Sequence, residues 1–235
     1  VRKEQGIIGQ EIRMCEDSPN RRVLFNLLKA LYQNCPVRVD IAGTVESIAE
    51  ITPELLYSCY RSFYNLRNMV LVVAGNVDTD TVLRVADRVL IPAPEWNLER
   101  AATAEPIQAA ASRVEADMPV AAPLFYYGYK CPVQGTAYRP AAELVAADVL
   151  LELLAGKSSP LYARLLREGL INTSFGCQYF EGPGYASWLF GGESRDPDAV
   201  AAAIREEISR LQRTGIPEED FRMARNMVYG RLISA

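Results

Sequence analysis

The chain has 235 residues, a formal net charge of −4 and a mean hydropathy near zero, which are typical of a globular protein with a sizeable core. The acidic balance and the absence of a Lys/Arg cluster exclude a nucleic-acid-binding surface, and no apolar run is long enough to cross a membrane. The sequence contains no histidine, which excludes His-dependent nucleophilic catalysis and a zinc site built on histidines of this chain.

The five cysteines are widely spaced and include no Cys-x-x-Cys pair. This pattern argues against a thiolate zinc site and against a disulfide framework, so a cytoplasmic setting is expected. The first residues are charged and follow a helical pattern, unlike those of a signal peptide.

The first part of the chain is predicted to form helices around one apolar strand. Helical spacing extends over residues 2–17 and the stretch RRVLFNLLKALYQN, and a short helix is expected near 45–50. Thr52 and Pro53 form a start signal for the helix ELLYSCYRSFY, and Asp78 can cap the helix TDTVLRVADRVL. The β-branched run NMVLVVAGNVD between these helices predicts a buried strand.

The second part alternates predicted strands and helices. RVEADMPVAAPLFYYGYKCP predicts two strands, and a long helix is expected at about 138–155. Ser159 is the predicted cap of the helix in SSPLYARLLREG. NTSFGCQYF and YASWLFGGES predict paired strands joined by the turn EGPG, followed by helices near 197–213 and from about Pro217.

Two stretches of the chain share one order of elements. MVLVVAGNVDTDTVLRVADRVL and YASWLFGGESRDPDAVAAAIREEISRL each combine a strand, a glycine turn, a capping Asp and an amphipathic helix. The simplest interpretation is two related units joined by a Pro/Ala-rich linker. We therefore predict an α+β fold of two related α/β half-units with mixed, mostly antiparallel sheets covered by helices.

The first predicted helix, VRKEQGIIGQEIRM, carries a pair of carboxylates, Glu4 and Glu11. Seven residues make two helical turns, so both side chains face within about 20° of each other and lie about 10.5 Å apart along the axis. The apolar residues Ile7 and Ile8 lie between them. This arrangement fits either a solvated helix edge or part of a site, although two side chains so far apart cannot easily bind one ion together.

The same stretch, VRKEQGIIGQEIRMCEDSP, resembles the pitrilysin/insulinase-type zinc metallopeptidases, which include mitochondrial processing peptidase, and especially their bacterial cytoplasmic branch. The family motif has the pattern E-x-x-x-I-x-x-E-I on a helix, which Glu4, Ile8, Glu11 and Ile12 match. Three further stretches resemble the family in the same order: AGTVESIAEITPELLYSCYRSFYNLRNMVLVVAGNVD, GKSSPLYARLLREGLINTSF and GIPEEDFRMARNMVYGRLI. The resemblance covers most of the chain and implies the metallohydrolase fold of processing peptidases.

The resemblance also implies roles for three residues. Glu11 takes the position of the third zinc ligand, and Glu4 that of a glutamate that supports the catalytic site without binding the metal. Alignment leaves Leu166 or Arg167 at the position of the family's substrate-binding arginine, which makes Arg167 the candidate. The cofactor of the full-length enzyme is then Zn²⁺.

One part of the family pattern is missing. The His-x-x-Glu-His motif supplies two zinc ligands and the catalytic base in this family, and this chain has no equivalent. The histidines belong either to a longer protein or to another polypeptide, and the ending RLISA inside an apparent helix favours a fragment of a longer enzyme. We expect this chain alone to be inactive and to bind zinc weakly at best.

The parent protein is expected to be a zinc metalloendopeptidase that hydrolyses peptides or unfolded polypeptides in an enclosed chamber. A homologous peptidase subunit or a second copy of the chain is the expected protein partner. The alternative is a non-catalytic, chamber-forming subunit or interaction domain of such a peptidase, which would have no need for a ligand glutamate.

The resemblance divides the chain as follows. Residues 1–92 correspond to the second half of the first peptidase domain, 93–112 to a linker, and 113–235 to the first half of the second homologous domain. The first and the last helix are then equivalent elements of two homologous domains.

Overall fold

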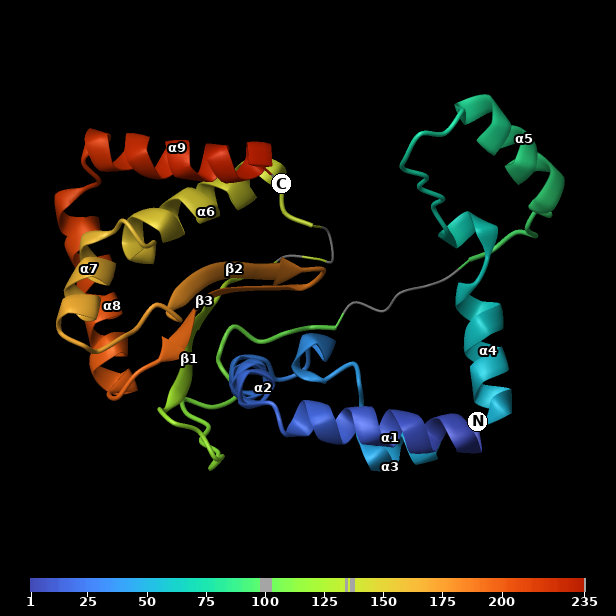
Figure 1. Cartoon of the computed structure of the whole chain (residues 1–235), viewed down its shortest axis with the longest axis horizontal. Coiled ribbons are helices and arrows are strands. Elements are labelled where there is room, and N and C mark those ends of the chain that lie inside the picture. The colour runs from blue at the N-terminus through green and yellow to red at the C-terminus, as the bar shows by residue number, and fades with distance from the viewer. Residues whose placement is uncertain (98–102, 134, 136–137, 235) are drawn as a thin grey trace. The chain divides into compact units, whose positions relative to one another are not determined.

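In a computed structural model, residues 1–97, 103–133, 135 and 138–234 are described, and they form helices and one small sheet (Figure 1). The helices are α1 (Arg2–Glu16), α2 (Pro19–Leu31), α3 (Val45–Ala49), α4 (Pro53–Phe63), α5 (Thr79–Val89), α6 (Ala141–Ala155), α7 (Pro160–Arg167), α8 (Pro197–Thr214) and α9 (Glu218–Ser234), with 3-10 helices η1 (Pro36–Arg38) and η2 (Leu66–Asn68). The strands are β1 (Leu124–Lys130), β2 (Gly176–Gly182) and β3 (Tyr185–Glu193). The predicted α+β fold is confirmed. No described helix has both the length and the apolar character of a membrane span.

The chain forms two compact units. Their residues are Val1–Ile12 with Gly43–Ala101 in unit 1, and Arg13–Ala42 with Ala102–Ala235 in unit 2. The boundary between the units therefore falls inside α1, and α2 belongs to unit 2.

The predicted division into peptidase domains concerns which domain each part of the chain belongs to, and it stays a prediction. It separates residues 1–92 from 113–235, whereas the compact units are interleaved along the chain. Of the predicted linker at 93–112, residues 98–102 lie outside the described residues.

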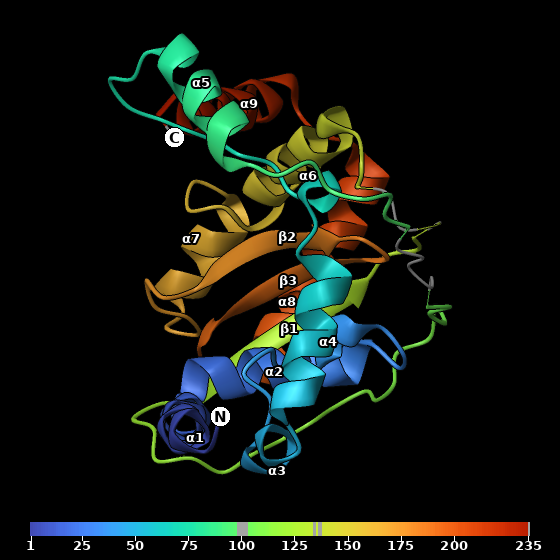
Figure 2. The same ribbon diagram turned by 90° about the vertical axis from the view of Figure 1, so that its right-hand side faces the viewer.

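The sheet of unit 2 is antiparallel, with the strand order β1-β3-β2 (Figure 2). The paired strands predicted from NTSFGCQYF and YASWLFGGES are confirmed as β2 and β3, and β1 pairs with the other side of β3. The additional strand expected in RVEADMPVAAP does not form among the described residues. Pro119 and Pro123 lack the N–H groups that a strand ladder needs, which explains the difference.

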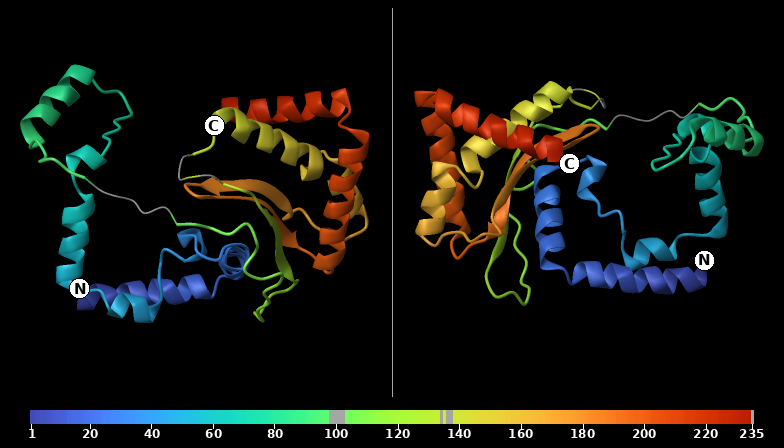
Figure 3. Two further views of the ribbon diagram at one scale, coloured as in Figure 1. Left: turned by 180° about the vertical axis from the view of Figure 1, so that it is seen from behind. Right: turned by 45° about the horizontal axis from the view of Figure 1, so that its top comes forward.

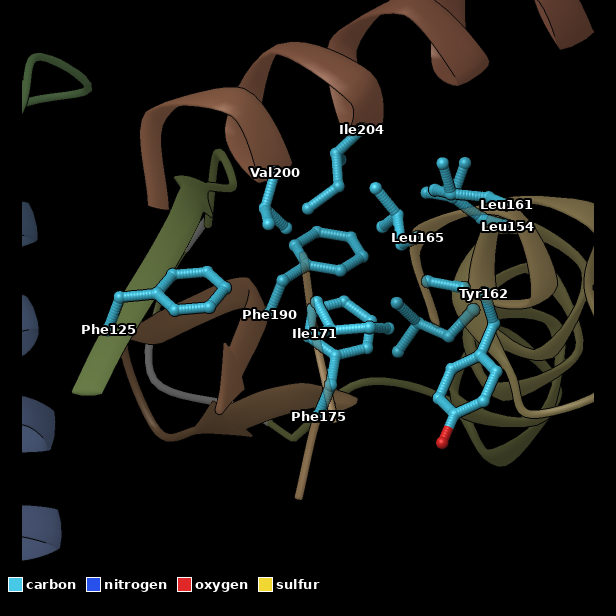
Figure 4. Close-up of a cluster of buried hydrophobic side chains, with 12 residues drawn as sticks. Phe125, Leu154, Leu161, Tyr162, Leu165, Ile171, Phe175, Phe190, Val200 and Ile204 are labelled. Carbon is cyan, nitrogen blue, oxygen red and sulfur yellow. The ribbon is translucent and has the colours of Figure 1, made fainter. Parts of the chain in front are cut away.

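The central strand β3 is buried on both faces of the sheet because its side chains alternate between two layers. Phe190 points into the larger core, where Val200 and Ile204 of α8 and Leu165 of α7 meet it (Figure 4). The neighbouring residue, Leu189, is fully buried in a second cluster on the opposite face. Each such buried side chain contributes roughly 1.5–3 kcal/mol to stability.

Helix α2 covers the second face of the sheet (Figure 1). Its side chains Leu28 and Leu31 are buried, and Tyr32, which follows the helix, shares a hydrogen bond with Ser187 of β3. Gly128 of β1 permits this close approach, since a Cβ there would lie 3.1 Å from the Leu31 side chain. α2 and β1 therefore pack more tightly than a larger residue would allow.

The helix starts follow local sequence signals in both units. Four predicted caps form hydrogen bonds with main-chain N–H groups two or three residues into the helix. They are Thr52, Asp78, Ser159 and Asp196, which accept hydrogen bonds from the N–H groups of Leu55, Thr81, Tyr162 and Ala199, respectively.

The buried strand predicted from NMVLVVAGNVD is wrong for this chain. Residues 69–74 belong to no strand, and Val70 and Val72 are 88% and 81% exposed. The described part of unit 1 buries only Ile12 and Ile48 among its large hydrophobic side chains. A strand requires neighbours for its hydrogen bonds and for packing, and no described segment supplies them to this apolar run.

Candidate functional site

Glu4 and Glu11 lie on α1, as predicted, beside its packed side. Gln5 fixes that packed side by donating a hydrogen bond to the main-chain oxygen of Ile48 (2.8 Å), and Ile12 is 2% exposed. Because Gln5 and Ile12 are two turns apart, their contacts fix the rotation of the helix about its axis. The face of α1 on which Glu4 and Glu11 lie is thereby fixed as well.

Both carboxylates are exposed, and the apolar side chains between them are exposed as well. Ile7 and Ile8 have exposed fractions of 45% and 39%. Among the described side chains, none donates a hydrogen bond to Glu4 or Glu11 or forms an ion pair with either. This face of α1 thus presents two free carboxylates and two uncovered isoleucines.

The described residues offer only part of a metal site at this face. They contain no group of three or more Cys, Asp or Glu side chains placed to hold a metal ion. A catalytic zinc site takes three protein ligands, whereas Glu11 supplies one carboxylate and Glu4 lies about 10.5 Å away along the helix. The residues present fit one ligand position of a zinc site and not a complete site.

Arg167, the predicted substrate-binding residue, is the last residue of α7 and is exposed. Leu161 and Leu165 are buried on the other side of this helix, together with Tyr162. No hydrogen bond or ion pair joins the Arg167 side chain to another described residue. Arg167 belongs to unit 2, whereas Glu4 and Glu11 belong to unit 1.

A third carboxylate, Glu152 of α6, is buried in unit 2 and was not singled out from the sequence. Its side chain is 6% exposed, and its Oε2 accepts a hydrogen bond from Nη2 of Arg231 in α9 (2.9 Å). Its other oxygen, Oε1, is buried and has no partner among the described residues. The signal in the sequence is a single acidic residue within the apolar run VLLELLA.

Gly156 makes room for the Glu152 carboxylate at the end of α6. A Cβ at position 156 would overlap both Oε1 and the carboxyl carbon of Glu152. The carboxylate therefore lies against the main chain of Gly156, and this position accepts no side chain without moving Glu152.

A fourth carboxylate, Glu105, anchors the predicted linker to unit 2. It forms an ion pair with Lys130 of β1, and both side chains are less than a tenth exposed. It also accepts hydrogen bonds from the N–H groups of Gln33, Asn34 and Cys35 at the end of α2. This part of the expected linker is thus packed structure, which its Pro/Ala-rich composition did not reveal.

The charged groups of this anchor satisfy each other. Burial raises the pKa of Glu105, but Lys130 and the three N–H groups outweigh that effect and lower the pKa to about 2. A cavity of about 460 Å³ lies beside the pair and is also lined by Tyr32 and Tyr185. Since Lys130 is bound to Glu105 and to main-chain oxygens, the charged atoms at this cavity are already engaged.

Comparison with known proteins identifies relatives of the chain. The pattern of the family described as "Peptidase M16 inactive domain" matches residues 50–228. The "Uncharacterized zinc protease YmfH" of Bacillus subtilis is 35% identical over 246 aligned positions, which cover 100% of this chain and 56% of that protein. A rickettsial relative, the "Uncharacterized zinc protease" of Rickettsia bellii, is 22% identical over 99% of this chain and 55% of its own length. The chain thus spans about half the length of these relatives.

Solved structures of peptidases share the fold of this chain. An M16-like peptidase from Alicyclobacillus acidocaldarius superposes with a TM-score of 0.89 and 38% identity, over 99% of this chain and 56% of that chain. A protease from Helicobacter pylori superposes with a TM-score of 0.82 and 20% identity, over 99% of this chain and 57% of that chain. The metallopeptidase resemblance and its α+β fold are confirmed, and the predicted hydrolase class holds at the level of the family. The chain belongs to the peptidase M16 inactive-domain family.

Proposed function

We propose that this chain is the part of a longer zinc metalloendopeptidase that contributes Glu11 as one zinc ligand. The observation that carries the proposal is the free Glu11 carboxylate, held on a helix whose packed side is fixed by Gln5 and Ile12. Its exposed neighbours Ile7 and Ile8 form an uncovered apolar surface beside it. Such a surface suits contact with a further segment of the longer protein.

Each of the candidate residues would have its own role in the reaction. Zinc, when bound, supplies the Lewis acidity that polarises the scissile carbonyl and lowers the pKa of a bound water. Glu11 would hold the metal from α1, and Glu4 would accept a hydrogen bond from a group beside the other ligands and so help to orient them. Arg167 offers a free guanidinium to carboxylate or carbonyl oxygens of a peptide.

The remaining ligands and the catalytic base must come from outside this chain, which has no histidine. A His-x-x-Glu-His motif in the longer protein would supply them. The proposed substrates are peptides or unfolded polypeptides. They would be enclosed in a chamber that a homologous subunit or a second copy completes. The chain alone is proposed to be inactive.

A second candidate function, a non-catalytic subunit of such a peptidase, is favoured by one specific observation. The matched family is described as an inactive domain, and its match begins at residue 50. Arg167 lies inside the matched region, whereas Glu4 and Glu11 lie outside it. Substitutions of these two glutamates therefore distinguish the two proposals, because only the catalytic proposal gives them a role.

The experiment compares the longer protein that contains this sequence with its Glu11→Gln variant. We expect zinc to be lost and chelator-sensitive cleavage of a quenched peptide to fall by more than about a hundredfold, because one ligand is removed. Glu4→Gln should cost roughly ten- to a hundredfold. Glu16→Gln, an exposed carboxylate at the end of the same helix, is the matched control and should change neither quantity.

The outcomes separate the two candidates. If Glu11→Gln retains zinc and activity, the ligand assignment is wrong. If the unaltered longer protein neither binds zinc nor cleaves peptides, the non-catalytic subunit is correct.

A further inference from the structure

Helix α3 lies beside the first part of α1 in unit 1, as the lighter and darker blue ribbons of Figure 3 show. Gln5 of α1 bridges the two helices. Its Nε2 donates hydrogen bonds to two main-chain oxygens, that of Ile48 (2.8 Å) and that of Ile51 (3.1 Å). Because an amide nitrogen carries two hydrogens, Gln5 uses its full donor capacity in this contact.

The two oxygens that accept from Gln5 are held in place by the structure of α3. Thr44 and Ser47 form a reciprocal capping box at the start of this helix, in which each hydroxyl accepts from the other residue's main-chain N–H group (2.9 and 3.1 Å). At its end, the N–H group of Ile51 donates to the oxygen of Ile48 (3.2 Å). Ile48 is also buried, so both acceptors belong to a segment of fixed geometry.

The contact requires an amide at position 5. A methionine, which has a similar length, would leave both carbonyl oxygens without their donor. A glutamate would direct negative oxygens at them and would place a further carboxylate next to Glu4. Glutamine donates two hydrogen bonds and adds no charge to this end of α1.

Gln5 can act on Glu11 only through the helix that carries both. The six residues between the two positions correspond to about 9 Å along the axis and about 120° around it, which is too far for direct contact. Both positions lie within the continuous helix Arg2–Glu16. A rotation of α1 at Gln5 is therefore carried to Glu11.

We propose that Gln5 is a positioning residue of the zinc site, which sets the rotation of α1 so that Glu11 meets the metal at the correct distance. The inference rests on the proposed function, because that function makes Glu11 a ligand. Zinc–oxygen distances vary only over about 2.0–2.2 Å, so a small rotation of α1 lowers the affinity for zinc even when the ligand itself is present.

The zinc affinity of the longer protein, measured by competition with a chromophoric chelator, tests this role. Gln5→Met should weaken zinc binding about tenfold, at the lower end of what is typical for residues that orient a metal ligand. Gln10→Met makes the same change at an exposed position of α1 and is the matched control, which should leave the affinity unchanged. Equal affinities of Gln5→Met and the unaltered protein would overturn the inference.

The Glu11→Gln background separates a positioning role from a general structural one. There, Gln5→Met should not weaken zinc binding further, because no ligand carboxylate is left to position. An equal loss in both backgrounds would contradict the inference. If Glu11→Gln alone leaves zinc affinity unchanged, the proposed function has failed. If Glu11→Gln weakens zinc binding and Gln5→Met does not, only the inference has failed.

A second variant and a second readout decide the matter if Gln5→Met does not fold. Gln5→Asn keeps the amide but is one methylene group shorter, so it cannot reach both carbonyl oxygens. In the cobalt-substituted longer protein, the visible absorption bands depend on ligand geometry and should shift in Gln5→Asn. The bands of Gln10→Asn should stay unchanged. Identical spectra of Gln5→Asn and the unaltered protein would contradict the role given to Gln5.

Discussion

The two units carry the same order of sequence elements, but the apolar run forms a paired strand only in unit 2. In unit 2, β3 is followed by the capping Asp196 and α8, and β1 and β2 pair with β3 on both sides. In unit 1, the apolar run 69–74 is followed by the capping Asp78 and α5, but no described strand pairs with it. The same local pattern becomes a central strand only where neighbouring strands are present.

Matched leucines make the difference quantitative. Leu189 lies seven residues before Asp196 and is fully buried. Leu71 lies seven residues before Asp78 and is 66% exposed. Position relative to the cap is thus equal, whereas burial is opposite, so the neighbours and not the local sequence decide the energetic weight of each leucine.

The largest expected effect is on these two leucines. Leu189→Ala should lower the free energy of unfolding of unit 2 by about 2–5 kcal/mol, because it opens a cavity in a packed core. Leu71→Ala should change the stability of this chain by less than about 0.5 kcal/mol. Urea unfolding followed by fluorescence measures both, since Trp188 reports on unit 2 and Trp96 on unit 1.

The effect of Leu71→Ala depends on whether residues 69–74 are covered. In the longer protein, Leu71→Ala should become costly if a further segment covers residues 69–74. A large cost of Leu71→Ala in this chain alone would contradict the 66% exposure of this side chain.

The second prediction concerns Glu105, which belongs to unit 2 and lies close in the sequence to the boundary with unit 1, and it asks to which unit the ion pair of Glu105 contributes stability. Glu105 has a folded-state pKa of about 2, below the ordinary value of 4.5, so its stabilisation is present above about pH 5 and is lost as the pH falls towards 2. Glu105→Gln should remove about 2–3 kcal/mol from unit 2 at pH 7 and abolish this part of the acid dependence. Trp188 fluorescence during urea unfolding at several pH values measures it.

Glu115→Gln is the control for this prediction, since its carboxylate pairs with Arg113 on the surface and is 71% exposed. It should leave the unfolding free energy nearly unchanged. If Glu105→Gln shifts the Trp96 transition instead of the Trp188 transition, the anchor contributes to the other unit.

The smallest expected effect is on the two helix caps. Asp196→Ala should destabilise unit 2 by about 1 kcal/mol, because it removes the hydrogen bond to the N–H group of Ala199. Asp78→Ala removes the equivalent hydrogen bond to Thr81 and should leave the Trp188 transition unchanged. A shift of that transition by Asp78→Ala would show that α5 contributes to the unit 2 core.

Features that depend on nearby residues could be predicted from the sequence. Thr52, Asp78 and Ser159 cap helices because a side-chain oxygen needs only the next turn as its partner. The hairpin of β2 and β3 is equally local. The spacing of Glu4 and Glu11 also needs only α1 to place both on one face.

Features that depend on distant residues could not be predicted in the same way. Glu105 pairs with Lys130 and with the end of α2, and nothing in its Pro/Ala-rich surroundings indicates those partners. Glu152 meets Arg231 only because α6 and α9 pack together. The run at 69–74 shows the opposite error, since its apolar pattern indicates burial that the described chain does not supply.

Gly156 follows α6 at a position where any side chain would meet two obstacles. A Cβ there would overlap Oε1 of Glu152 and would lie 2.5 Å from the main-chain oxygen of the same residue. Because that main-chain oxygen is present whatever residue occupies position 152, removing the acid alone would not make room for a side chain. Among relatives of this chain, glycine should therefore persist at position 156 even where position 152 is no longer acidic, and an alignment can test this.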